Sequence, residues 1–124
     1  MNHSDEITRS QIVARVLEAR KNRPQFLEGM RLRQQKGLAV AHKIARILRE
    51  EFGVQKIVLF GSMLSHENLS PHSDIDLAVW GLNEKDYFKA GAVIERGYNF
   101  SVDLVEVEKA KPHILRAIEK GVEL

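Results

Sequence analysis

Apolar residues recur at helical spacing over the first 50 positions of the chain. Five of them share one face of a helix between residues 24 and 51: Leu38, Ala41, Ile44, Ala45 and Leu48. A looser stripe of the same kind precedes residue 20: Ile7, Ile12, Val13, Val16 and Leu17. Because the residue before a proline is biased away from helix, Pro24 predicts a break between the two stripes. The pattern therefore predicts a helical arm over residues 1–23 and a separate domain over residues 24–124.

Beyond Gly53 the helical stripe gives way to short apolar runs that contain Ile and Val. Such runs are typical of buried strands, and we predict three: residues 56–60, 74–80 and 100–107. Capping and proline signals predict helices on either side of the third strand, at residues 83–96 and 112–120. This order of elements predicts an α/β (α+β) fold, in which a small mixed β-sheet is backed by helices and preceded by a helical arm.

The composition narrows the class of protein. The chain has 124 residues, of which 44% are hydrophobic and 29% are charged, as expected of one globular domain. The absence of cysteine excludes a disulfide framework and thiolate metal sites. No apolar run approaches the roughly 20 residues of a membrane helix, and the polar N-terminus lacks the apolar core of a signal peptide. We therefore expect a cytoplasmic protein without a membrane partner.

Charge is distributed unevenly along the chain. Residues 1–50 carry eleven Lys/Arg and five Asp/Glu, whereas residues 51–124 carry eight and twelve. A basic helical arm is able to meet nucleic acid or an acidic protein, and it is equally typical of a solvated helix face. Nucleic acid therefore stays open as a partner of the arm, but the charge pattern does not favour it.

Three carboxylates stand on the predicted strands. Because side chains alternate along a strand, Asp74 and Asp76 project from the same face. Asp103 lies inside the third strand, where aspartate is disfavoured unless it has a function. If the second and third strands are neighbours, the three carboxylates converge and repel one another unless a cation lies between them. Magnesium is the usual cation for such oxygen ligands, and it shares its shell with phosphate and water.

A Gly-Ser pair supplies a complementary feature. Gly61 and Ser62 directly follow the first strand, and ligands commonly bind at the ends of strands in α/β sheets. A glycine lets a phosphate approach the backbone, and the serine hydroxyl with nearby N–H groups can donate hydrogen bonds to it. Together with the three carboxylates, this pair predicts a site for a metal-bound nucleotide.

These motifs resemble a known family. The stretch "GSMLSHENLSPHSDIDLAV", followed by "VDLVEV", is similar to the nucleotidyltransferase superfamily related to DNA polymerase beta, and in particular to the minimal nucleotidyltransferases (MNT). The resemblance covers about residues 38–124, including the closing "ILRAIEKGVEL". It implies a polymerase-beta-like nucleotidyltransferase fold.

The resemblance also implies a role for each site residue. Gly61 and Ser62 would bind the triphosphate of ATP, and Asp74 and Asp76 would bind Mg²⁺. Asp103 would be the third carboxylate, which completes the metal site and favours deprotonation of the attacking hydroxyl. The expected catalytic and metal-binding residues are thus the three aspartates, and the expected nucleotide-binding residues are the Gly-Ser pair.

Two features depart from the family's pattern. Eleven residues separate Ser62 from Asp74, one more than in the family's common form. Relatives often carry an arginine two or three residues after the Gly-Ser pair, close to the phosphates, whereas "MLS" follows the pair here. The departures concern the segment that joins the two halves of the site.

The family implies a function. Minimal nucleotidyltransferases are often encoded beside HEPN-domain proteins and act as antitoxins, which bind the HEPN ribonuclease toxin and in some cases transfer AMP from ATP to it. We therefore expect a magnesium-dependent nucleotidyltransferase, an enzyme that modifies and neutralises a HEPN-type toxin in a hetero-oligomer. Two alternatives stay open: a non-catalytic antitoxin that masks its partner by contact, and a nucleotidyltransferase that acts on a small molecule such as an aminoglycoside.

Overall fold

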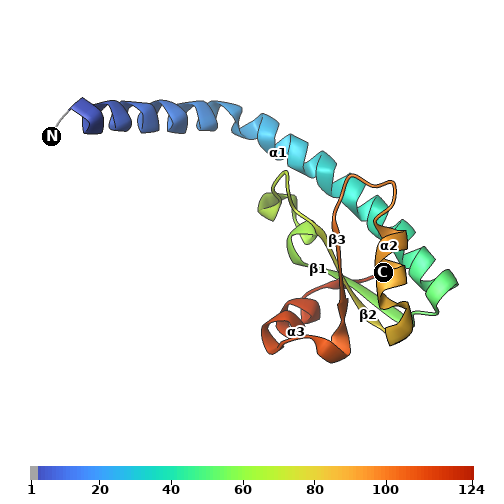
Figure 1. Cartoon of the computed structure of the whole chain (residues 1–124). Helices are drawn as coiled ribbons and strands as arrows, with labels where there is room; N and C mark the ends of the chain where they lie inside the picture. The colour runs from blue at the N-terminus through green and yellow to red at the C-terminus, as the bar shows by residue number, and fades with distance from the viewer. Residues whose placement is uncertain (1–2) are drawn as a thin grey trace.

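A single long helix forms the N-terminal part of the chain. The computed structural model describes the backbone of residues 3–124 and, within that range, the side chains of residues 8–18 and 22–124. Helix α1 (His3–Phe52) continues through Pro24, so the predicted helix break is wrong. A proline inside a helix removes one hydrogen bond and bends the helix, at a cost of about 3 kcal/mol, but residues that favour helix on both sides can carry it through. Figure 1 shows α1 changing direction part-way along.

The two apolar stripes of α1 have different surroundings. The second stripe is buried as predicted, with Ala41, Ile44 and Leu48 fully covered. In the first stripe the described side chains are between 45% and 59% exposed: Ile12, Val13, Val16 and Leu17. Ile7 lies outside the described side chains. This part of α1 extends away from the body (Figure 1), and the division at residue 23 stays a prediction because no break in secondary structure marks it.

The sheet is mixed, as the sequence predicts, and it has four strands, of which three lie close to the predicted positions and one was not predicted. The strands are β1 (Lys56–Phe60), β2 (Ile75–Trp80), β3 (Val102–Glu106) and the short β4 (Val122–Glu123). Their order across the sheet is β3-β2-β1-β4. β1 is antiparallel to β2 and to β4, whereas β2 and β3 are parallel. The strands predicted to carry the carboxylates are therefore neighbours.

Helices cover both faces of the sheet (Figure 1). On one face α1 and α2 (Tyr87–Ile94) bury the side chains that alternate inward from the strands, including Leu59, Ile75 and Leu77. On the other face α3 (Pro112–Glu119) packs with Ile118 against Val58. A turn of 3₁₀ helix (Glu84–Asp86) precedes α2, and Asn83 Oδ1 accepts a hydrogen bond from the backbone N–H of Lys85 at 3.0 Å. The sheet is thus a central layer whose two faces have separate cores.

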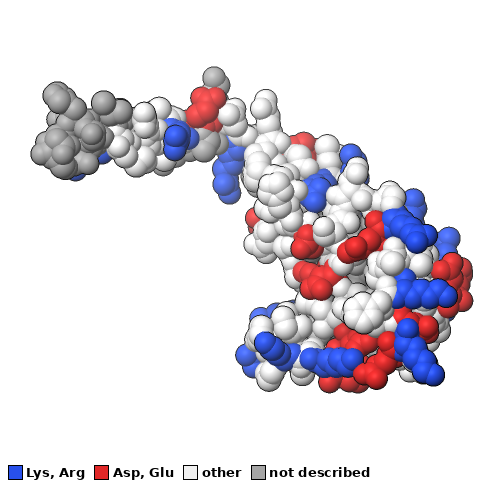
Figure 2. All heavy atoms as spheres, in the orientation of Figure 1, with Lys and Arg blue, Asp and Glu red and all other residues white. Residues whose placement is uncertain are grey.

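The surface mixes both signs of charge. On the face drawn in Figure 2, Lys/Arg and Asp/Glu side chains alternate over the body of the molecule. The positive excess of residues 1–50 therefore does not form one basic surface on this face. Although α1 is long, none of the helices in the described part of the chain has the apolar length that crossing a membrane requires.

Candidate functional site

The Gly-Ser pair and the second aspartate of "DID" meet where β1 ends. Phe60, the last residue of β1, is the cross-strand partner of Asp76 in β2. The next residue, Gly61, has a φ of +84°, a conformation that side-chain-bearing residues rarely adopt. A Cβ atom added at Gly61 would collide with Asp76 Oδ2. Only glycine fits here, because the backbone both turns and passes directly beside the carboxylate.

The three predicted carboxylates lie at the same end of the sheet, where β1 ends and where β2 and β3 begin. Asp76 and Asp103 are register partners in the parallel pair of β2 and β3. Asp76 shares its face of the sheet with Phe60 and Ala78, which belong to the core on the α3 side. Asp74 lies one residue before β2 and is exposed, as is Asp103, whereas Asp76 is half-buried. The structure thus brings Gly61, Asp76 and Asp103 together and places Asp74 beside them.

The surroundings of Asp76 disfavour the ionised form of its carboxyl group. Burial, together with the neighbouring carboxylates of Asp103 and Asp74, raises the pKa of Asp76 to about 6. A carboxyl group that is partly desolvated and faces two like charges binds a proton or a cation more readily than an isolated one. The arrangement therefore favours the binding of a cation at this end of the sheet.

The donor set fits a magnesium ion that is shared with a ligand. Among the residues that the structure describes, no three His, Cys, Asp or Glu side chains stand close enough to enclose a metal by themselves. Magnesium, however, is usually held by one or two carboxylates together with substrate phosphates and water, and not by an all-protein cage. Asp74, Asp76 and Asp103 are the residues that would hold it.

Ser62 lies in a short turn, and the chain then folds on itself before it reaches Asp74. The turn is a 3₁₀ helix (Gly61–Leu64), and a second one follows (His66–Asn68). Further along, the backbone N–H of Ser70 donates to Ser73 Oγ at 2.9 Å, and the N–H of Ser73 donates to the Ser70 carbonyl at 3.1 Å. These local bonds take up the eleven residues between Ser62 and Asp74 in compact turns.

The strand that carries Asp103 is an edge strand with its own supports. The Tyr87 hydroxyl donates to the Leu104 carbonyl at 3.1 Å. Lys109 Nζ lies 2.9 Å from Glu106 Oε2 and 2.8 Å from Glu84 Oε1. Contacts from α2 and from the segment after β3 therefore hold the strand beside β2.

Two residues of α1 reach the site from the opposite face of the sheet. Arg33 Nη2 donates to the carbonyl of Ser73, the residue before Asp74, at 3.1 Å. Gln34 Nε2 donates to the carbonyl of Met63, the residue after Ser62, at 3.1 Å. Nothing in the sequence points to either residue, because the contacts span 40 and 29 positions and the pattern of α1 marks only its apolar face.

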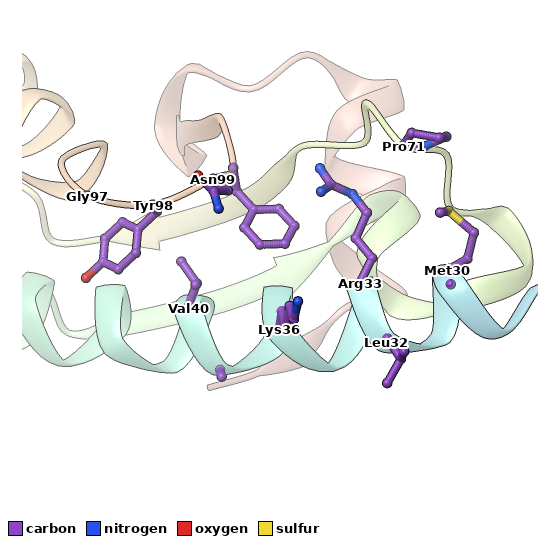
Figure 3. Close-up of a pocket in the computed structure, with 12 residues that line it drawn as sticks. Met30, Leu32, Arg33, Lys36, Val40, Pro71, Gly97, Tyr98 and Asn99 are labelled. Carbon is purple, nitrogen blue, oxygen red and sulfur yellow. The ribbon is translucent and has the colours of Figure 1, made fainter. Parts of the chain in front are cut away.

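A groove lies beside these contacts without containing any predicted site residue. It has a volume of about 620 Å³ and is lined from α1 by Met30, Arg33 and Lys36, and from the loop before β3 by Tyr98 and Phe100 (Figure 3). The carboxylates project from the other face of the sheet. The groove is therefore separate from the predicted nucleotide site.

Comparison with known families agrees with this geometry. Residues 42–124 match the sequence pattern of the family described as "Polymerase beta, Nucleotidyltransferase". The chain belongs to this nucleotidyltransferase family. The matched segment includes both halves of the site, from Gly61 to Asp103. The predicted resemblance is confirmed.

Solved structures of similar chains come from toxin–antitoxin assemblies. One is described as a toxin–antitoxin with AMP-PNP; it is 28% identical, has a TM-score of 0.54, and the match covers 66% of this chain and 69% of that one. Another belongs to a mutant of the toxin–antitoxin MntA-HpeT, with 28% identity, a TM-score of 0.53, and coverage of 68% and 70%. No curated protein sequence matches the chain. The polymerase-beta-like fold is thereby confirmed.

The family segment does not include all of the residues that surround the candidate site. It begins at residue 42, whereas Arg33 and Gln34 lie earlier in α1. The contacts that these two residues make with Ser73 and Met63, next to the two halves of the site, are therefore a feature of this chain outside the matched segment.

Proposed function

We propose that this nucleotidyltransferase is an MNT-type antitoxin that transfers AMP from ATP to a HEPN-type toxin protein and so neutralises it. The observation that carries the proposal is the contact of Gly61 with Asp76, which is in register with Asp103. It brings the expected phosphate-binding and metal-binding groups to one place. The similar chains in toxin–antitoxin structures, one of them with AMP-PNP, support both the partner and the nucleotide. We further propose a cytoplasmic location.

Each site residue has a role in this proposal. Gly61 lets the triphosphate approach the backbone, and Ser62 donates hydrogen bonds to it. Asp74, Asp76 and Asp103 hold Mg²⁺, which when bound neutralises phosphate charge. The acceptor hydroxyl oxygen attacks the α-phosphorus of ATP and forms a new P–O bond, while the bond to the pyrophosphate oxygen breaks and pyrophosphate leaves with the electron pair. The hydroxyl proton passes to the carboxylate of Asp103.

The test is to incubate the purified chain with ATP labelled at the α-phosphate, Mg²⁺ and a HEPN-type toxin. We expect label on the toxin, and a loss of at least 100-fold in rate when Asp74 and Asp76 are both replaced by asparagine. Asp86→Asn, which removes an acid beyond the far end of β2, is the matched control. Absence of label transfer by the wild-type chain, or equal transfer by the double variant, contradicts the proposal.

A second candidate function rests on the missing arginine and on the longer segment between Ser62 and Asp74. Two or three residues after the Gly-Ser pair, where relatives often carry an arginine, this chain has Leu64 and Ser65. A chain that lacks this cation would act as a binding antitoxin that masks the toxin by contact. Full neutralisation of the toxin by the Asp74→Asn, Asp76→Asn double variant would favour that function. AMP transfer to an aminoglycoside by the chain alone would instead favour a small-molecule substrate.

A further inference from the structure

We propose that Arg33 and Gln34 are positioning residues for the nucleotidyltransferase site, which fix Ser62 in its phosphate half and Asp74 in its metal half, beyond the pairing of β1 with β2 that already holds Gly61 beside Asp76. This inference rests on the proposed function, because it assigns a task to residues that touch neither nucleotide nor metal. The two halves are Gly61 with Ser62 and Asp74 with Asp76. Each half is joined to α1 by one of two consecutive helix residues.

Gln34 and Gly37 anchor the phosphate half. The Gln34 side-chain amide donates to the Met63 carbonyl, one residue after Ser62, at 3.1 Å. The Met63 side chain is fully buried and lies so close to Gly37 that a Cβ there would collide with its sulfur. Both the backbone and the side chain of Met63 are therefore held by α1, and the Gly-Ser turn directly precedes it.

Arg33 anchors the metal half. Its guanidinium donates to the Ser73 carbonyl at 3.1 Å, and Asp74 is the next residue. The same guanidinium lies 4.3 Å from the centre of the Phe100 ring, two residues before β3. In Figure 3 the Arg33 side chain rises from α1 towards the loop that carries Pro71. One side chain thus contacts the chain just before each of the two strands that carry carboxylates.

The burial of Arg33 is difficult to explain by stability alone. Its Nε is buried and makes no hydrogen bond with the residues that the structure describes. A buried donor without a partner costs stability, so an apolar side chain at this position would satisfy packing better. What arginine adds is the reach to Ser73 and Phe100 together.

The two anchors, Arg33 and Gln34, matter because of the segment that joins the two halves of the site. The eleven residues from Met63 to Ser73 contain short turns held by local hydrogen bonds, and they are tied to the core by the buried side chains of Met63 and Leu69. Consecutive residues of an α-helix point about 100° apart, so Arg33 and Gln34 can reach two different segments from one rigid element. Loss of either anchor would let its half move by a fraction of an ångström to an ångström, and misplacement on that scale costs about 10- to 100-fold at a catalytic site.

The test compares matched variants of α1. Arg33→Met and Gln34→Met keep the length of each stem and remove its hydrogen bond, whereas Arg33→Lys keeps the charge. Arg31→Met is the control, because Arg31 is exposed and pairs with Glu28 on the same helix. Affinity for Mg²⁺ with AMP-PNP is measured by calorimetry, the melting temperature by circular dichroism, and kcat and KM by AMP transfer to the toxin.

At temperatures at which the variants are folded, we expect Arg33→Met and Gln34→Met each to weaken Mg·AMP-PNP binding about 10-fold. Arg33→Lys should recover part of the affinity, and Arg31→Met should leave it unchanged. The double variant should lose less than the product of the single losses, because both anchors serve one site whose geometry is already disturbed once either is gone. Binding within twofold of wild type by both folded single variants overturns the inference. If Arg33→Met does not fold, Gln34→Met decides the result. Failure of the wild-type chain to bind Mg·AMP-PNP overturns the proposed function itself.

Discussion

Asp76 and Asp103 lie opposite each other in the parallel pair of β2 and β3, with their side chains on one face of the sheet. A pair of carboxylates in register is unfavourable without a cation, and Asp76 is also partly desolvated. The site is therefore least stable in the ionised, metal-free state, and its stability should depend on pH.

Replacing Asp76 by asparagine should stabilise the metal-free chain at high pH. The pKa of Asp76 is raised from 3.8 to about 6, so its ionisation opposes folding. The penalty is absent below pH 3.8, grows as the pH rises to 6, and is complete above that. We expect Asp76→Asn to raise the free energy of unfolding by about 1 kcal/mol at pH 8, less than the full equivalent of the shift because the side chain is partly solvated. At pH 4 the difference should nearly vanish.

Urea unfolding in EDTA at pH 4 and pH 8 measures the effect. A difference between Asp76→Asn and wild type that is the same at both pH values would contradict the electrostatic explanation. Adding Mg²⁺ at pH 8 should stabilise the wild type and reverse the order of the two proteins.

Gly61→Ala should damage the site more than a comparable glycine substitution elsewhere. Gly97 has a similar φ of +79° but has open space around it, so Gly97→Ala reports backbone strain alone, about 1–2 kcal/mol. Gly61→Ala adds a collision with Asp76 to the same strain. We expect a larger loss of unfolding free energy and loss of Mg·AMP-PNP binding with Gly61→Ala only. Equal losses in the two variants would show that the contact with Asp76 is unimportant.

Two glycines of α1 should respond to alanine with opposite signs. Gly29 has open space, and Gly29→Ala should stabilise the helix by about 0.5–1 kcal/mol. Gly37→Ala gains the same helix propensity but must displace the Met63 sulfur, and overpacking of this kind costs about 1–3 kcal/mol. Thermal or urea unfolding of the two variants measures the difference. A stabilising Gly37→Ala would mean that Met63 moves aside freely.

The apolar stripe of the extended part of α1 should contribute little to stability. Val16 is 45% exposed, so Val16→Ser should change the unfolding free energy by less than about 0.5 kcal/mol. Ile44 is fully buried, and Ile44→Ala should cost about 2–5 kcal/mol. Urea unfolding distinguishes these outcomes. A cost above 1 kcal/mol for Val16→Ser would indicate that the stripe packs against the chain in solution.

The features predicted well from the sequence depend on short-range patterns. The first strand, residues 56–60, has the predicted bounds, and the third is shorter than predicted by two residues at its start and one at its end. The Gly-Ser corner and Asp76 could be placed together because a buried strand ends directly before one and begins directly before the other. Alternation along β2 then puts Asp76 on the face away from Leu77.

The features that the sequence did not reveal depend on the rest of the molecule. Pro24 biases only the residue before it away from helix, and the helix-forming residues on both sides outweigh this bias. Arg33 looked like one of many charges on a helix, since its partner Ser73 is 40 residues away. Nothing in the sequence indicates that Gly37 is the place where Met63 packs against α1. For Arg33 and Gly37 the deciding contact is between segments whose proximity no local pattern encodes.

The continuity of α1 has a mechanical consequence for the two anchored halves. Leu17 in the exposed stripe is about 24 Å along the helix axis from Arg33, and Pro24 lies between them. Sideways bending of the outer segment can be absorbed at the proline, where the hydrogen-bond ladder is interrupted. A displacement of the inner segment as a rigid rod carries Arg33 and Gln34 equally, so it shifts Met63 and Ser73 together and leaves the gap between them unchanged. Under the proposed anchoring, only a twist or unwinding of α1 between these two adjacent residues changes that gap.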